Sequence, residues 1–140
     1  MKAVLLLRIA SVLSLVHCAL HTVGGVFGRP RHGAEEIAVI ETMKSHRFDV
    51  MGSLRSYWDF FFGYGLVVTI SLLVQSILLW QVSALVRKDA PSMKPVIALL
   101  FFSWVATAIV SGRYFFAAPA VTELLIAACL AVAFFTAAST

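Results

Sequence analysis

Charged residues are scarce in this chain. Only 13% of its 140 residues are Asp, Glu, Lys or Arg, whereas 61% are hydrophobic, and a typical soluble domain has about 25% charged residues. The composition is therefore that of a protein built for a lipid bilayer.

Eleven basic residues against seven acidic ones give a formal charge of +4, and these charges fall mainly between the apolar stretches. In a membrane protein such an excess contacts anionic headgroups and sets orientation. No basic face with interleaved aromatic residues is present, so we expect no nucleic-acid partner.

Cysteine is almost absent. The chain has two cysteines, Cys18 and Cys129, and both lie inside apolar stretches without a Cys-x-x-Cys pair. We therefore do not expect a thiol–disulfide oxidoreductase, and we expect both side chains to pack as small hydrophobes. An Ala-x-Ala cleavage pattern is also missing after the first apolar stretch, where Gly24, Gly25 and Gly28 follow instead. We therefore expect this stretch to be retained as a membrane span.

Long apolar stretches fill most of the sequence. A bilayer core about 30 Å thick needs roughly 20 apolar residues per helix. The sequence predicts one all-α domain over residues 1–140, an integral membrane four-helix bundle. We place its spans at approximately residues 3–23, 57–86, 95–112 and 119–138, and a polar, partly helical connection between the first two spans at approximately residues 29–56.

The polar connection carries a helical pattern of its own. Ala34 to Ser45 is expected to form a short helix, because Glu35 and Glu36 favour a first turn and Ile37, Ile40 and Met43 repeat at helical spacing. A soluble loop this long without structure would be uncommon. The connection is therefore predicted to place a short helix near the membrane surface.

The ends of the later spans are marked by capping and interfacial residues. Ser56 and Asp59 resemble a capping box at the start of the second span. Trp58 and Trp80 are 22 residues apart, which is about 33 Å on a helix and matches two aromatic belts. Pro95 and Pro119 are expected to begin the third and fourth spans. The short basic hairpin of residues 87–95 favours both termini in the cytoplasm.

A polar stripe runs along the first span. Ser11, Ser14, His17 and His21 recur at intervals of three or four and share one helix face. The two histidines resemble part of a zinc-binding pair, but a third ligand is missing, so we expect no metal. Three roles stay open for them: hydrogen bonding within the bundle, contact with a ligand, substrate or proton, and metal or haem binding.

Glu123 is an ionisable residue within the fourth span. Such residues are costly in a membrane and usually have a partner or a function. Arg113 lies just across the short connection to the third span. We therefore predict a structural ion pair between Arg113 and Glu123. Arg8, near the start of the first span, is expected to extend its side chain to the interface.

The start of the second span resembles a known family. Residues 51–66 read MGSLRSYWDFFFGYGL, which resembles a Gly-x-x-Arg-x-Tyr-Trp-x-Phe…Gly-x-Gly-Leu block of small bacterial four-span membrane proteins. Residues 21–24 and 79–81 extend the similarity over roughly the first 85 residues. The resemblance implies the bacterial inner membrane, and the family brings no activity with it.

These observations predict one polar end of the bundle as the candidate site. Our leading hypothesis is a non-enzymatic membrane protein that contacts membrane lipids and binds a lipophilic small molecule or lipid, or serves as a partner subunit of another membrane protein. The alternative is a membrane-embedded enzyme on a lipophilic substrate, with His21 or His46 as acid–base and Glu123 or Asp59 orienting it. No cofactor is expected. The candidate ligand-binding residues are His17, His21, Arg55, Tyr57, Asp59 and His46.

Overall fold

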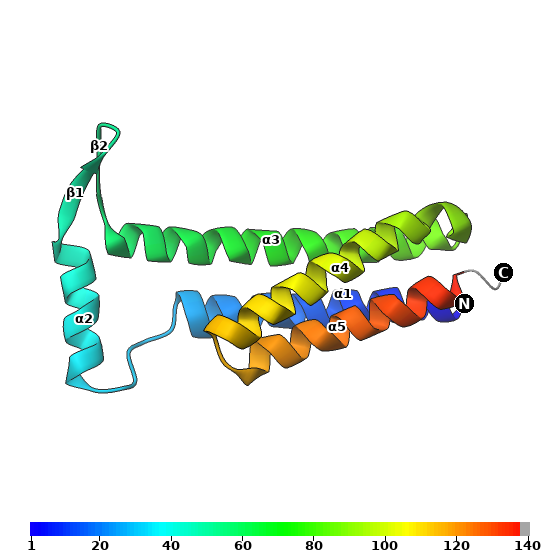
Figure 1. Ribbon diagram of the computed structural model, residues 1–140, viewed down its shortest axis with the longest axis horizontal. Coiled ribbons are helices and arrows are strands. Elements are labelled where there is room, and N and C mark those ends of the chain that lie inside the picture. The colour runs from blue at the N-terminus through cyan, green and yellow to red at the C-terminus, as the bar shows by residue number, and fades with distance from the viewer. Residues whose placement is uncertain (138–140) are drawn as a thin grey trace. The chain divides into compact units, whose positions relative to one another are not determined.

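The computed structural model describes residues 1–137 as a helical protein (Figure 1). Its fold class is the predicted one, an all-α protein with four helices long and apolar enough to cross a membrane. The elements are α1 (Lys2–Leu20), the π-helix η1 (His21–Val26), α2 (Ala34–Ser45), β1 (Arg47–Val50), β2 (Ser53–Ser56), α3 (Tyr57–Val86), α4 (Ala90–Tyr114) and α5 (Ala117–Thr136).

The third span is longer than the sequence predicted. It begins at Ala90 rather than near Pro95, because the Asp89 side chain accepts a hydrogen bond from the backbone N–H of Ser92 (3.2 Å) and caps the helix there. Pro91 occupies the first turn, where a missing N–H costs least. Pro95 therefore lies inside α4. The fourth span ends at Thr136, and residue 138, its predicted end, lies outside the described residues.

The chain divides into two compact units. The bundle unit comprises residues 1–18 and 72–140, and the connector unit comprises residues 19–71. Helices α1 and α3 each contribute residues to both units.

The bundle unit has a core to which four helices contribute. Its largest fully buried apolar side chains are Leu7 from α1, Leu79 from α3, Ile97 and Trp104 from α4, and Ile126 and Leu130 from α5. Helices α4 and α5 lie side by side and antiparallel, joined by a short turn (Figure 1). In a bilayer the lipid tails are as apolar as these side chains, so close packing supplies most of the stabilisation.

Serine hydroxyls join α1 to α3 inside the bundle unit. Ser11 Oγ donates to the carbonyl oxygen of Ser76 (2.8 Å), and Ser76 Oγ donates back to the carbonyl oxygen of Ser11 (2.9 Å). Ser14 Oγ donates to the carbonyl oxygen of Leu72 (3.3 Å). Interhelical hydrogen bonds of this kind contribute about 0.6 kcal/mol each on average in membranes. Two members of the predicted polar stripe therefore hold helices together.

In the connector unit, α1 continues as the π-helix η1. Here Val26 is buried and packs against Gly65 of α3, where an added Cβ would lie 3.0 Å from a Val26 methyl carbon. A glycine at position 65 therefore lets the two helices approach closely, as small residues do in membranes. The π-helix ends at Val26, and position 28 just beyond it requires glycine, because a Cβ there would overlap the carbonyl oxygen of Gly24.

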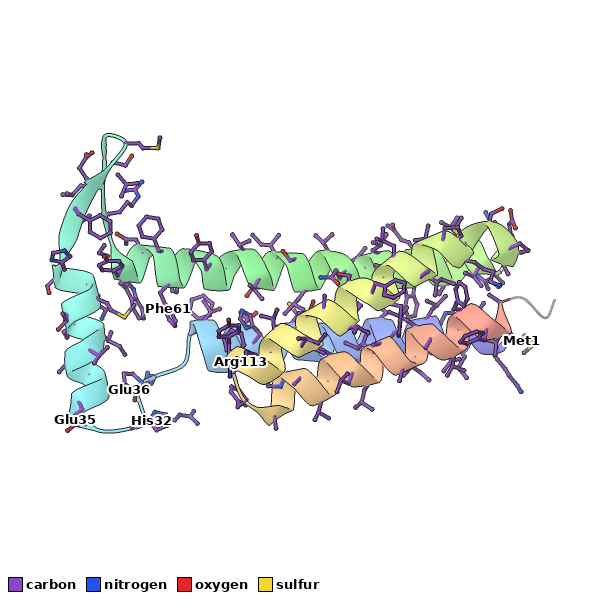
Figure 2. All side chains as sticks on the ribbon, in the orientation of Figure 1. Met1, His32, Glu35, Glu36, Phe61 and Arg113 are labelled. Carbon is purple, nitrogen blue, oxygen red and sulfur yellow. The ribbon has the colours of Figure 1, made fainter. Side chains whose placement is uncertain are left out.

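The helix predicted in the connection is confirmed with the same bounds, Ala34–Ser45. Glu36 accepts hydrogen bonds from the backbone N–H groups of Arg31 and His32 (2.6 and 2.7 Å), which fixes the chain before the helix (Figure 2). These backbone donors, that of His32 first, lower the pKa of the Glu36 carboxyl. The start of α2 is therefore organised by local hydrogen bonds.

A β-hairpin that was not predicted from the sequence follows α2. Strands β1 and β2 pair antiparallel, with Val50 opposite Ser53. The two turn residues, Met51 and Gly52, both have positive φ, 53° and 81°, as a type I′ turn requires. The Asp49 side chain accepts a hydrogen bond from the Gly52 backbone N–H (3.1 Å). The hairpin leads directly into α3.

Candidate functional site

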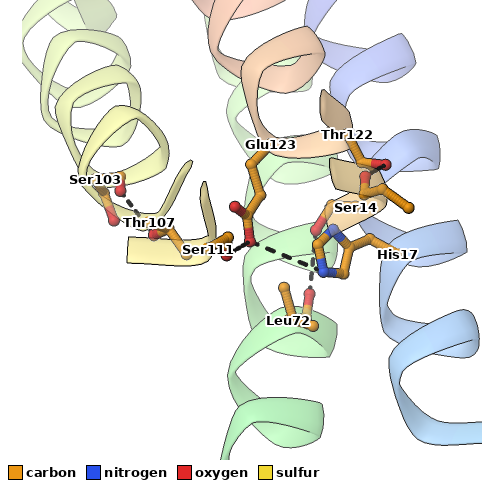
Figure 3. A network of polar contacts seen from close by, with 9 residues as sticks. Ser14, His17, Leu72, Ser103, Thr107, Ser111, Thr122 and Glu123 are labelled. Carbon is orange, nitrogen blue, oxygen red and sulfur yellow. Dashed lines mark hydrogen bonds and ion pairs between the residues drawn. The ribbon is translucent and has the colours of Figure 1, made fainter. Parts of the chain in front are cut away.

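Four polar residues gather inside the bundle unit and form what we call the buried polar cluster: His17, Trp104, Ser111 and Glu123. Ser111 Oγ of α4 donates a hydrogen bond to Glu123 Oε1 of α5 (3.0 Å), and His17 Nε2 of α1 lies 3.9 Å from the same oxygen (Figure 3). The rings of His17 and Trp104 are 6.4 Å apart between centroids. Three helices thus bring an acid, a base and two hydrogen-bonding groups together.

The buried polar cluster is closed off from its surroundings. Glu123 is 2% exposed, Trp104 1% and His17 9%. Within residues 1–137, Glu123 Oε2 and Trp104 Nε1 are buried without a hydrogen-bond partner. A buried polar atom without a partner costs about 1–3 kcal/mol, and more when it is charged. Such an arrangement is retained in proteins where it has a use, or where a small molecule satisfies it.

The predicted ion pair between Arg113 and Glu123 is not formed within residues 1–137. Arg113 lies exposed near the end of α4 (Figure 2). Glu123 is the seventh residue of α5, about 9 Å of helix rise from its start, and its side chain is turned inward to His17 and Ser111. A guanidinium at the helix end reaches water more easily than it reaches the bundle interior. The ion-pair partner of Glu123 is therefore His17 of α1, which sequence proximity could not indicate.

Of the six predicted ligand-binding residues, His17 belongs to the bundle unit and the others belong to the connector unit. His46 stacks on Tyr57, with ring centroids 6.1 Å apart and an angle of 11° between the planes. His21 contacts α3 at a later residue, because its Nε2 lies 3.1 Å from the carbonyl oxygen of Gly65. Gly65 is eight residues beyond Tyr57, or about 12 Å along α3. In the connector unit the histidines therefore contact different levels of α3.

Asp59 and Arg55 have local roles. The Ser56 backbone N–H donates to Asp59 Oδ2 (2.8 Å), and the Asp59 backbone N–H donates to Ser56 Oγ (3.2 Å), so the predicted capping box is confirmed. Arg55 lies in β2 and donates from Nη1 to the carbonyl oxygen of Leu54 (3.1 Å). Position 55 precedes α3, which begins at Tyr57, so Arg55 and Asp59 do not share a helix face.

His17 of α1 and His21 of η1 do not form part of a metal site in the described part of the chain. Within residues 1–137, no group of three or more His, Cys, Asp or Glu side chains is arranged to hold a metal ion. His17 contacts Glu123, whereas His21 contacts a backbone carbonyl. The two imidazoles therefore make separate contacts.

A second feature of the bundle unit, which we call the basic pocket, was not predicted as a site. It has a volume of about 740 Å³, within the roughly 300–1,000 Å³ range of ligand pockets. Among the residues that the structure describes, three of those lining the pocket are basic and none is acidic. The pocket is lined by Met1, Lys2, Ala3, Val4, Leu5, Arg8, Val86, Arg87, Ala90, Thr136 and Ala137.

Arg8 is the most constrained cation of the basic pocket. Its guanidinium carbon lies 5.0 Å from the centre of a Trp80 ring, a cation–π contact that fixes the side chain. Its Nε is buried and has no hydrogen-bond partner within residues 1–137. Because Arg8 lines the pocket, it contributes a positive charge there. The signal in the sequence was Arg8 inside a span together with the basic hairpin after the second span.

The two features differ in the chemistry that they allow. The basic pocket combines cations with apolar walls, which suits an amphiphilic anion. The buried polar cluster offers a carboxyl group and an imidazole away from water, which suits a proton or a hydrogen-bonding group. Comparison of the chain with protein families, with curated proteins and with solved structures finds no match.

Proposed function

We propose that this protein is a non-enzymatic membrane protein that binds a lipophilic anion, a lipid with a phosphate headgroup, in the basic pocket. The observation that carries this proposal is a pocket of about 740 Å³ whose described lining residues include three cations, no acid and an apolar wall. Basic pockets between membrane helices hold anionic headgroups, and guanidinium groups match phosphate oxygens in bidentate geometry.

The depth of Arg8 in the membrane supports a lipid rather than a soluble anion. Tryptophan is enriched at the membrane–water interface, and the guanidinium of Arg8 lies over Trp80. A lipid headgroup bound by Arg8 would thus lie at the membrane–water interface, as headgroups do in a bilayer. Its acyl chains would meet apolar side chains such as Val4, Leu5 and Val86.

The same charges support an orientation. Lys2, Arg8 and Arg87 line the pocket together with Ala137, near the end of the described chain. The cytoplasmic leaflet is anionic, and short basic loops stay on that side. We propose both termini in the cytoplasm and, from the resemblance of residues 51–66, the bacterial inner membrane.

The enzymatic alternative has less support. His21 Nε2 contacts the Gly65 carbonyl, and the His46 ring stacks on Tyr57. Within residues 1–137, no ion pair joins either imidazole to a carboxylate. The predicted orienting acid Asp59 caps its own helix.

Native mass spectrometry with defined lipids tests the proposal. The full chain is purified with equal amounts of phosphatidylglycerol and phosphatidylcholine, and R8Q is compared with wild type. We expect one retained phosphatidylglycerol on the wild type and about tenfold weaker retention on R8Q. A hydrogen bond to a charged group contributes about 1.5–3 kcal/mol, and 1.4 kcal/mol is tenfold in affinity.

The matched control is R113Q, which removes an exposed arginine from the opposite end of α4. It should bind phosphatidylglycerol as wild type does. Equal loss in R113Q and R8Q, or equal retention of both lipids, would contradict the proposal. Competition by glycerol phosphate distinguishes a soluble phosphate ligand from a lipid, and the mass of a second chain would favour the partner-subunit hypothesis.

A further inference from the structure

The buried polar cluster contains an acid without a matching fixed cation. Glu123 is 2% exposed within an apolar span. The groups facing it are Ser111 from α4, which donates one hydrogen bond, and His17 from α1, the one titratable side chain in an ion-pair contact with it within residues 1–137. From α3, no ion pair or hydrogen bond to Glu123 is found in the same range. The charge of the cluster therefore depends on how many protons Glu123 and His17 bind.

A deprotonated Glu123 beside a neutral His17 would be poorly stabilised. A carboxylate offers about four acceptor positions, and Ser111 fills one of them at 3.0 Å. Oε2 has no partner within residues 1–137. The distance of 3.9 Å to His17 Nε2 is longer than a hydrogen bond and suits an ion pair. An unpaired charge in such an interior costs several kcal/mol or more.

Two arrangements avoid this cost, and both contain one additional proton. In one, Glu123 is a neutral carboxylic acid beside a neutral imidazole. In the other, the carboxylate faces a His17 imidazolium. We propose that His17 and Glu123 form an intramembrane proton-binding site that holds one proton at neutral pH, so that the pair has no net charge. This proposal is independent of lipid binding in the basic pocket.

The bound proton has a structural consequence. The pair joins α1 to α5, and Ser111 adds α4 through its hydrogen bond to Glu123. Loss of the proton would leave a net negative charge among these three helices, which only water entry or helix separation would solvate. The proton therefore keeps this part of the bundle unit closed, and Ser111 acts as a positioning residue.

Infrared and NMR spectroscopy of the full chain in nanodiscs at pH 7 test the proposal. We expect either a protonated-carboxyl band that E123Q removes, or a His17 imidazolium ¹⁵N signal that H17Q removes. Either result supports one bound proton and locates it. A Glu123 carboxylate with a neutral His17, or both groups protonated together, would overturn the proposal.

Two further variants keep the test decisive. E41Q removes an exposed glutamate of α2 that pairs with Lys44, and it should leave the assigned band or signal in place. S111A removes the hydrogen bond to Glu123 Oε1 and should shift the same band or signal without abolishing it. If E123Q does not fold, this shift still assigns the signal, and the absence of any shift in S111A overturns the proposal.

Discussion

The bundle unit and the connector unit are stabilised in different ways. In the bundle unit, large side chains from α1, α3, α4 and α5 are fully buried, and polar side chains are buried among them. In the connector unit, α2 buries no residue and the hairpin buries only Ser56. Its order comes instead from the capping box at the start of α3, the turn at Met51 and Gly52, and the carboxylate of Glu36.

This difference explains why both proposed roles lie in the bundle unit. Groups that need an environment without water, such as the carboxyl group of Glu123, lie where several helices pack around them. The connector unit has side chains of several kinds exposed, for instance Tyr57, Arg55 and the fully exposed Met51. A surface organised by local hydrogen bonds tolerates change without loss of the bundle. We therefore expect substitutions in the two units to have separate effects.

The largest expected effect is the loss of stability caused by a cavity in the core of the bundle unit. Leu79 of α3 is fully buried, whereas Leu73 of the same helix is 43% exposed. L79A should lower the free energy of unfolding by about 2 kcal/mol, because packing is lost although lipid tails solvate the unfolded helix well. Reversible unfolding in bicelles measures this. L73A is the matched control and should change stability by less than about 0.5 kcal/mol. Equal losses would show that burial does not distinguish these faces.

A smaller effect is expected at the hairpin turn of the connector unit. Gly52 has φ of 81°, a region that costs an L-residue roughly 1–2 kcal/mol. G52A should therefore speed amide hydrogen exchange in β1 and β2 while leaving the exchange of α4 and α5 unchanged. G63A is the control, since a Cβ there meets no atom within 4 Å. Faster exchange in α4 would mean that the two units do not unfold separately.

The sequence indicated the elements better than their contacts. The bounds of α2 and α3 could be predicted because composition and capping residues mark their ends, as Glu35 and Asp59 do. The hairpin was missed because its strands have four residues each and its turn is Met51-Gly52. That dipeptide is a weaker turn signal than Asn-Gly. Local sequence patterns therefore predict local interactions, but not contacts between distant segments.

The candidate site depended on contacts between distant segments. Sequence proximity suggested Arg113 as the partner of Glu123, but the partner, His17, lies 106 residues away. Which face of α5 meets α1 depends on how the helices pack, and an apolar helix in lipid carries little periodicity to reveal it. The basic pocket was hidden for the same reason, since Arg8 and Arg87 come from different helix ends.

The smallest effect is expected at a local interaction in the bundle unit, the helix cap that Asp89 provides for α4. Hydrogen bonds from the Ser92 side chain and backbone N–H lower the pKa of the Asp89 carboxyl. Its contribution is therefore complete above the ordinary Asp pKa of about 3.9 and is lost as the pH falls through the lower folded value. D89A should lower the melting temperature slightly at pH 6, and the difference from wild type should disappear in strong acid. D89N keeps a capping oxygen and should not show this acid dependence. A loss in D89A as large as that in L79A would mean that capping rather than packing holds α4, and the comparison between the units would fail.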